Sequence, residues 1–144
     1  YKMIARSTIR LNLRDKITAL GYIESPNYWE SFGRNPQNRA DKMFAIGFAS
    51  TVESGGRQSA KTGIAIASDV SVMVAFIVKP HTAVASYDDA LDGIEDIIKS
   101  VINPSTPLYT NTQIRFASSS ITLTDIGEWQ IAKIDFQITN HLPL

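Results

Sequence analysis

The stretch GIAIASDVSVMVAFIV, residues 63–78, most constrains what this chain can fold into. Bulky apolar side chains recur at every second position from Ile64 to Phe76 except at Ser68, and the positions between them are mostly small or polar. Because successive side chains of a strand point to opposite faces, this alternation predicts a β-strand with one face against a core. Sixteen residues would extend about 53 Å at roughly 3.3 Å per residue, far beyond an ordinary strand. We therefore expect a bend or bulge near Ser68 and Asp69, or an arm that projects from the domain.

The composition is that of an ordinary globular protein, and it argues against several classes of function. With 144 residues, 44% hydrophobic and 19% charged, we expect one domain spanning residues 1–144. No apolar run approaches the ~20 residues of a membrane span, and no signal peptide is visible. The lack of cysteine excludes disulfides, and a net charge of zero argues against general nucleic-acid binding. The sequence begins at Tyr1 rather than at methionine, so we expect that preceding residues were removed or lie outside it.

A first amphipathic helix is predicted over residues 7–20, where apolar side chains recur every three or four residues and Gly21 follows as a stop. Arg6, Arg10 and Arg14 form a basic stripe beside the apolar one. Two interpretations of this stripe are open. It is a solvated face, which is the commoner case, or it is a docking surface.

A second amphipathic helix is predicted over residues 86–102, with Ser86 and Asp89 in the positions of a capping box. Four apolar residues form its predicted buried stripe: Leu91, Ile94, Ile98 and Val101. Five carboxylates form an acidic face: Asp88, Asp89, Asp92, Glu95 and Asp96. If the helices lie side by side, the basic stripe of the first complements this acidic face. The candidate interface residues of that match are Arg10, Arg14, Asp92 and Glu95.

The remaining pattern predicts an α+β fold. Alternating segments indicate strands at 22–24, 42–52, 112–117 or on to 123, and 128–139. The connection 53–62 is of hairpin type, so we expect a mostly antiparallel sheet. The order is α-β-β-β-α-β-β, with a long β-hairpin arm. We predict a two-layer sandwich in which both helices cover one apolar face of the sheet.

The residues offer little support for catalysis. His81 and His141 lie in a loop and in the tail, without metal-ligand spacing. The acidic helix lacks the glycine-containing loop of an EF-hand, and the SGGR sequence lacks the spacing of a phosphate-binding loop. Asp69 has no visible acid or base partner, which favours a salt bridge or a subunit contact. We therefore expect no enzymatic activity, no cofactor and no metal site.

The sequence does offer surface suited to assembly. Small residues on one face of the two long strands let another backbone approach closely, and a long exposed hairpin invites edge pairing. Arg57, Gln58 and Lys61 on the hairpin are candidates for contact with a neighbour. Trp29 and Phe32 lie in an irregular loop, where aromatic residues either plug the core edge or anchor a partner. Homo-oligomerisation through the strand edges would account for both features.

Three stretches carry a resemblance to a known family: STIRLNLRDKITALG, the hairpin around ESGGRQSAK, and SYDDALDGIEDIIKSVIN with the strands that end in QIAKIDFQITN. Together with the element order, the size and the missing catalytic set, they resemble the tail terminator family of long-tailed bacteriophages, also called tail completion or minor tail protein U-like. The resemblance implies a hexameric ring that sits on the tail tube, ends its polymerisation and docks the neck.

The resemblance also implies partners and a location. The partners are further copies of the chain, the major tail tube protein and a head-completion or stopper protein. Genomic DNA passes through the lumen without sequence readout, and no membrane is involved. The location is the tail–neck region of the virion, after assembly in the host cytoplasm. Two alternatives stay open: another neck, head-completion or ring-forming tail protein, and a small ligand-binding α+β domain with a pocket at the helix-covered sheet edge.

Overall fold

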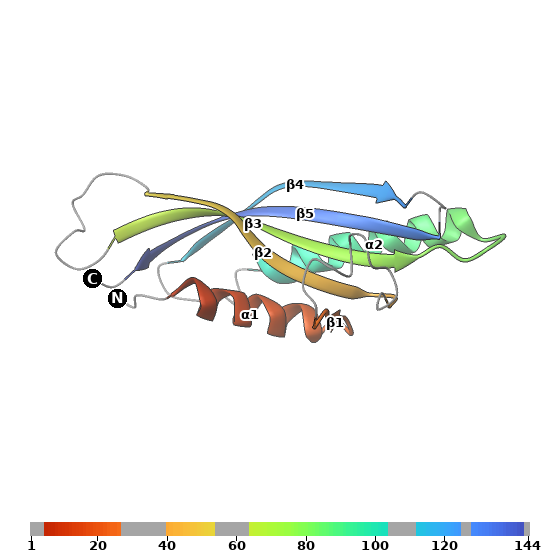
Figure 1. Ribbon diagram of the computed structural model, residues 1–144, viewed down its shortest axis with the longest axis horizontal. Coiled ribbons are helices and arrows are strands. Elements are labelled where there is room, and N and C mark those ends of the chain that lie inside the picture. Colours follow the sequence, from red (N-terminus) through yellow and green to blue (C-terminus); the bar gives the residue numbers. More distant parts are fainter. Residues whose placement is uncertain (1–4, 27–39, 54–63, 104–111, 125–127, 143–144) are drawn as a thin grey trace.

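Both helices of the computed structural model lie on the same face of a five-stranded sheet (Figure 1). The structure describes residues 5–26, 40–53, 64–103, 112–124 and 128–142. Its elements are α1 (Arg6–Thr18), β1 (Ile23–Glu24), β2 (Met43–Glu53), β3 (Ile64–Ile77), α2 (Ala83–Ile102), β4 (Gln113–Leu123) and β5 (Trp129–Leu142). The predicted order and the α+β class are confirmed. No described helix is long and apolar enough to cross a membrane.

The strands are arranged in the order β1-β2-β3-β5-β4. Every neighbouring pair is antiparallel except β1 and β2, which run parallel. The strands that lead to the predicted hairpin arm are paired to their ends, because Glu53 lies opposite Ile66 and Ile64 lies opposite Leu142. The connection itself, residues 54–63, lies outside the described residues.

The irregularity predicted near Ser68 and Asp69 lies in the neighbouring strand. β3 continues through both residues, whereas the register of β2 shifts between Phe48 and Ser50, opposite Asp69. A second shift interrupts β4 in the adjacent row of the sheet. A β-bulge increases the local twist of a strand, so these two bulges let the outer strands follow the long central pair.

The core lies between the helix-facing rows of the sheet and the two helices. Its largest fully buried sheet residues are Phe44, Ile46, Val70, Val72, Val74, Ile134, Phe136 and Ile138. The helices contribute Ile9, Leu13 and Ile17 from α1 and Ala90, Ile94, Ile97 and Val101 from α2. Burial of one such large aliphatic side chain contributes about 1.5–3 kcal/mol. The alternation predicted for β3 therefore places its bulky face in the core.

Two details of the predicted second helix are wrong. The helix begins three residues earlier, so Ser86 lies inside it, and its hydroxyl oxygen accepts a hydrogen bond from the Lys79 backbone N–H at 3.1 Å. Leu91 is 38% exposed rather than buried. The buried stripe instead uses the small residues Ala90 and Gly93, which bring the helix backbone close to the sheet and turn Leu91 toward β4.

Candidate functional site

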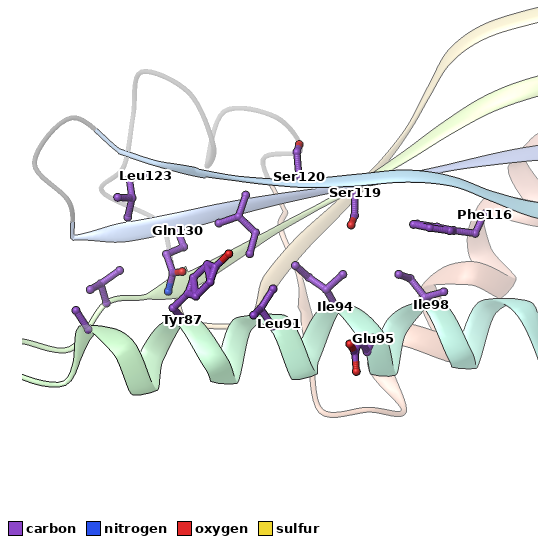
Figure 2. A pocket seen from close by; sticks show the side chains of 13 residues that line it. Tyr87, Leu91, Ile94, Glu95, Ile98, Phe116, Ser119, Ser120, Leu123 and Gln130 are labelled. Atoms are coloured by element: carbon purple, nitrogen blue, oxygen red, sulfur yellow. The ribbon is translucent and has the colours of Figure 1, made fainter.

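An apolar groove, called here the α2–β4 groove, lies between α2 and β4 (Figure 2). It encloses about 710 Å³. Its main apolar walls are Tyr87, Leu91 and Ile98 from α2 and Phe116, Ile121 and Leu123 from β4. Figure 2 shows the side chains of α2 rising toward β4, with Ile98 facing Phe116. The groove therefore runs along one flank of the molecule, between a helix and a sheet edge.

The groove exists because α2 leaves the outermost strand partly uncovered. β4 lies at the edge of the sheet, and none of its residues is fully buried. Phe116 is consequently 42% exposed and Leu123 is 62% exposed. Contiguous exposed apolar side chains of this kind mark interaction surfaces in soluble proteins.

Polar side chains also line the α2–β4 groove, among them Ser119, whose hydroxyl points toward α2 (Figure 2). The Gln130 side chain is buried, and its Nε2 donates a hydrogen bond to the Ser86 backbone oxygen at 3.2 Å. Glu95 lies on the outer side of α2 at the rim (Figure 2). Among the described lining residues no histidine or lysine accompanies this carboxylate. The groove is therefore suited to apolar contact with one negative charge at its edge.

The basic stripe of α1 lies on the opposite flank. Arg10 Nη1 is 3.1 Å from Glu24 Oε2 of β1, and Arg14 Nη2 is 3.0 Å from Asp15 Oδ1 of its own helix. Arg6 Nη1 donates to Thr51 Oγ1 of β2 at 2.9 Å. Among the described residues these arginines therefore contact Glu24, Asp15 and Thr51, and none of these contacts joins them to the acidic face of α2.

A second, smaller groove of about 470 Å³ lies on the α1 side of α2. Asp92 lines it, together with Asp89, Asp96 and the buried ring of Tyr22. Burial, with the nearby charge of Asp96 as a further cause, raises the pKa of Tyr22 to about 12. Across the described residues, no group of three or more His, Asp or Glu side chains is placed to hold a metal ion.

The sheet face opposite the helices carries a polar row. Asp135 of β5 accepts hydrogen bonds from the hydroxyls of Ser71 at 2.6 Å and Ser118 at 3.2 Å, which ties three strands together. Asp69 lies two residues before Ser71 on β3, opposite Gln137, and is exposed. It forms no ion pair with another described residue.

The structure does not bring all the sequence candidates together. Glu95 and Asp92 lie on opposite sides of α2, and the arginines lie on the far flank. The remaining candidates, Arg57, Gln58, Lys61, Trp29 and Phe32, lie outside the described residues.

The α2–β4 groove lies at a helix-covered sheet edge, where the sequence left a ligand pocket open as an alternative, and of the candidate site residues Glu95 lines it. The signal for it was weak but present in the serine-rich run of β4, residues 118–120, which interrupts the apolar alternation between Phe116 and Ile121. A strand with so few large side chains is typical of a sheet edge that its own core does not fully cover.

Comparisons with known proteins support the fold. No protein-family model and no curated protein sequence matches this chain. Among solved structures, a chain described as part of the "Virion of native gene transfer agent (GTA) particle" matches with a TM-score of 0.54 at 11% sequence identity. The match covers 90% of this chain and 91% of that chain. At this identity the likeness is one of fold, and it extends over nearly the full length of both chains.

Proposed function

We propose that this chain is a structural virion protein that forms a ring, in the manner of a phage tail terminator. In this role it caps the tail tube, ends polymerisation of the tube and offers a docking surface to the connector of the head. The observation that carries the proposal is the near full-length fold likeness to a chain of a gene transfer agent virion. The predicted resemblance to tail terminators points in the same direction, from the sequence.

The two flanks of the molecule support assembly. One flank carries the apolar α2–β4 groove, and the other carries Arg10 and Arg14 beside the β1–β2 edge. Two different surfaces on one chain suit head-to-tail contacts, which close into rings when the rotation between subunits permits. A ring would cover both sheet edges, which otherwise invite uncontrolled pairing.

The chemistry of the groove favours a structural role over an enzymatic one. General acid–base catalysis needs a titratable side chain within hydrogen-bond reach of the substrate proton that it transfers. The α2–β4 groove offers apolar side chains, with Glu95 at its rim. We therefore propose that the protein is not an enzyme and that it requires no cofactor.

Tube growth provides the test. Purified protein is measured by light scattering and native mass spectrometry, alone and with candidate tail-tube protein, and tube lengths are counted by electron microscopy. A ring, or a monomer that assembles only on tube ends, together with shortened tubes supports the proposal. A monomer that leaves tube growth unchanged contradicts it. Binding to the head-side connector without any effect on tubes would instead indicate a neck or head-completion protein.

One observation favours a second candidate, a small ligand-binding domain. The volume of the α2–β4 groove, about 710 Å³, lies within the roughly 300–1,000 Å³ of known ligand sites. A strict monomer whose thermal unfolding temperature rises with an apolar ligand would favour this function.

A further inference from the structure

We infer that the α2–β4 groove of one subunit receives the Arg14 side of helix α1 from a second copy of this chain, in a head-to-tail contact. The inference rests on the proposed ring-forming function and names the partner of the groove. Three features carry it: the matching sheet edges, the position of the helices above those edges, and the opposite charges at the two flanks.

The two edges of the sheet are suited to pairing with each other. β2 is antiparallel to β3, β3 to β5 and β5 to β4, so β4 and β2 of one chain run in opposite directions. A second copy in the same orientation, added beside β4, therefore presents its β2 as an antiparallel partner. Through the shared register, Gln113 lies in the same row as Val52, and Thr122 lies in the same row as Met43.

Among the described strands, the outer edge of β2 pairs only with the short strand β1. β1 covers this edge only at Met43 and Phe44, and no other described strand pairs along it. β4 and β2 each have 11 residues, and the rows that they cover are offset by one, so that Glu53 and Leu123 each lie one row beyond the end of the other strand. Pairing of the two edges would therefore continue one sheet from subunit to subunit.

The same arrangement of subunits also determines which helices lie side by side. α1 and α2 lie on the same face of the sheet, with α1 against β1 and α2 against β4 (Figure 1). A second copy that extends the sheet beyond β4 brings its own α1 to the open side of the α2–β4 groove. The groove then becomes the space between two helices of one continuous layer.

The charges at this contact are complementary. Arg10 contacts β1, and Arg14 follows one helical turn later on the same side of α1, with their side chains 36% and 38% exposed. The aliphatic stem of an arginine covers apolar surface while its guanidinium stays at the rim. Arg14 of the incoming copy can therefore lie over Leu91 and place its charge beside Glu95, where a bidentate ion pair is favourable.

The contact is tested by reversing each charge and then mixing the variants. Glu95→Arg makes the groove repel the arginine side of α1, and Arg14→Glu makes that side repel Glu95. Each variant alone should show a lower mass than the wild type by light scattering at low salt. In an equal mixture, the unchanged groove of the Arg14→Glu variant can bind the unchanged Arg14 side of the Glu95→Arg variant. The two reversed surfaces also carry opposite charges, so the mass should return to that of the wild type. The chain with both substitutions should also assemble.

The controls separate this contact from general charge effects. Asp89→Arg changes an exposed carboxylate on the other side of α2, and Lys133→Glu changes an exposed charge on the opposite sheet face. Both should keep the wild-type mass. Circular dichroism tests whether each variant is folded. Where a charge-reversal variant does not fold, the neutral variant Glu95→Gln or Arg14→Gln is measured in its place. For these neutral variants, the expected result is a lower mass and a weaker dependence of assembly on salt.

The outcomes are distinct from those of the ring proposal. A wild type that is monomeric at all concentrations, reversals that leave its mass unchanged, or a mixture that stays dissociated would overturn the inference. If the wild type assembles through this contact but does not shorten tubes, the tail-terminator proposal fails and the inference stands. If the wild type caps tubes and the reversals assemble normally, only the inference fails.

Discussion

The backbone of Gly93 in α2 passes directly against the hydroxyl group of Tyr22. A Cβ atom at this position would lie 2.5 Å from that oxygen and 3.0 Å from Cε1 of Phe76. The Tyr22 and Phe76 rings pack edge to face with centroids 6.1 Å apart, so neither ring can move away freely. Glycine is therefore what allows α2 to lie this close to the sheet and to open the groove on its other side.

Gly93→Ala should destabilise the protein by roughly 1–3 kcal/mol, as overpacking of a core does. Helix propensity alone predicts the opposite sign, because Ala is about 1 kcal/mol better than Gly inside a helix. Urea unfolding measures the difference. In a Tyr22→Phe background, which lacks the hydroxyl, the same substitution should cost less. A Gly93→Ala protein more stable than the wild type would show that the close approach is not limiting.

Tyr22 should make stability depend on alkaline pH. Burial raises its pKa from 10.0 to about 12, so the folded state retains a proton that the unfolded state has released. The free energy of unfolding should fall as pH rises from about 10 to about 12, by on the order of 2 kcal/mol. Below pH 10 this contribution is fully present. Phenolate absorbance during a pH titration gives the pKa, and Tyr22→Phe should abolish this part of the pH dependence.

Leu91 and Ile97 offer a matched comparison on one helix. Ile97 is completely buried, and Ile97→Ala should cost about 2–5 kcal/mol of unfolding free energy. Leu91 lies in the α2–β4 groove with 38% exposure, so Leu91→Ala should cost less than about 1 kcal/mol but weaken self-association. Urea unfolding and sedimentation velocity separate the two effects. Equal losses of stability would mean that Leu91 serves the core.

Asp135 should stabilise the sheet through its hydrogen bonds to Ser71 and Ser118. Asp135→Ala leaves the buried Ser71 hydroxyl without this acceptor, and we expect a loss of about 1–3 kcal/mol. Lys133→Ala, two residues away on the same face and exposed, is the control and should change stability by less than about 0.5 kcal/mol. Thermal unfolding monitored by circular dichroism compares the two variants. Similar unfolding temperatures would show that the polar row adds no stability.

Much of the fold could be predicted from periodicity. The period of two in β3 and β5 and the spacing of Ile9, Leu13 and Ile17 in α1 depend on local geometry, which each segment carries in its own residues. The predictions that were wrong concern residues whose burial depends on a neighbouring element. Leu91 fits a helical stripe as well as Ile97 does, and only the close packing around Gly93 shows which of the two is buried.

The same division applies to the candidate site. Sequence identified the charged residues, including Arg14 and Glu95, because a charge and its helical spacing are visible in the order of the residues. Whether these charges pair within one chain or between chains depends on the flank of the molecule on which each charged side chain lies. The order of strands in the sheet sets that flank. Sequence by itself therefore determined the elements and their apolar faces, since these arise from local periodicity. Tertiary structure alone decided that β4 is the uncovered edge and that the groove lies beside it, because contacts between distant segments set the edge of a sheet.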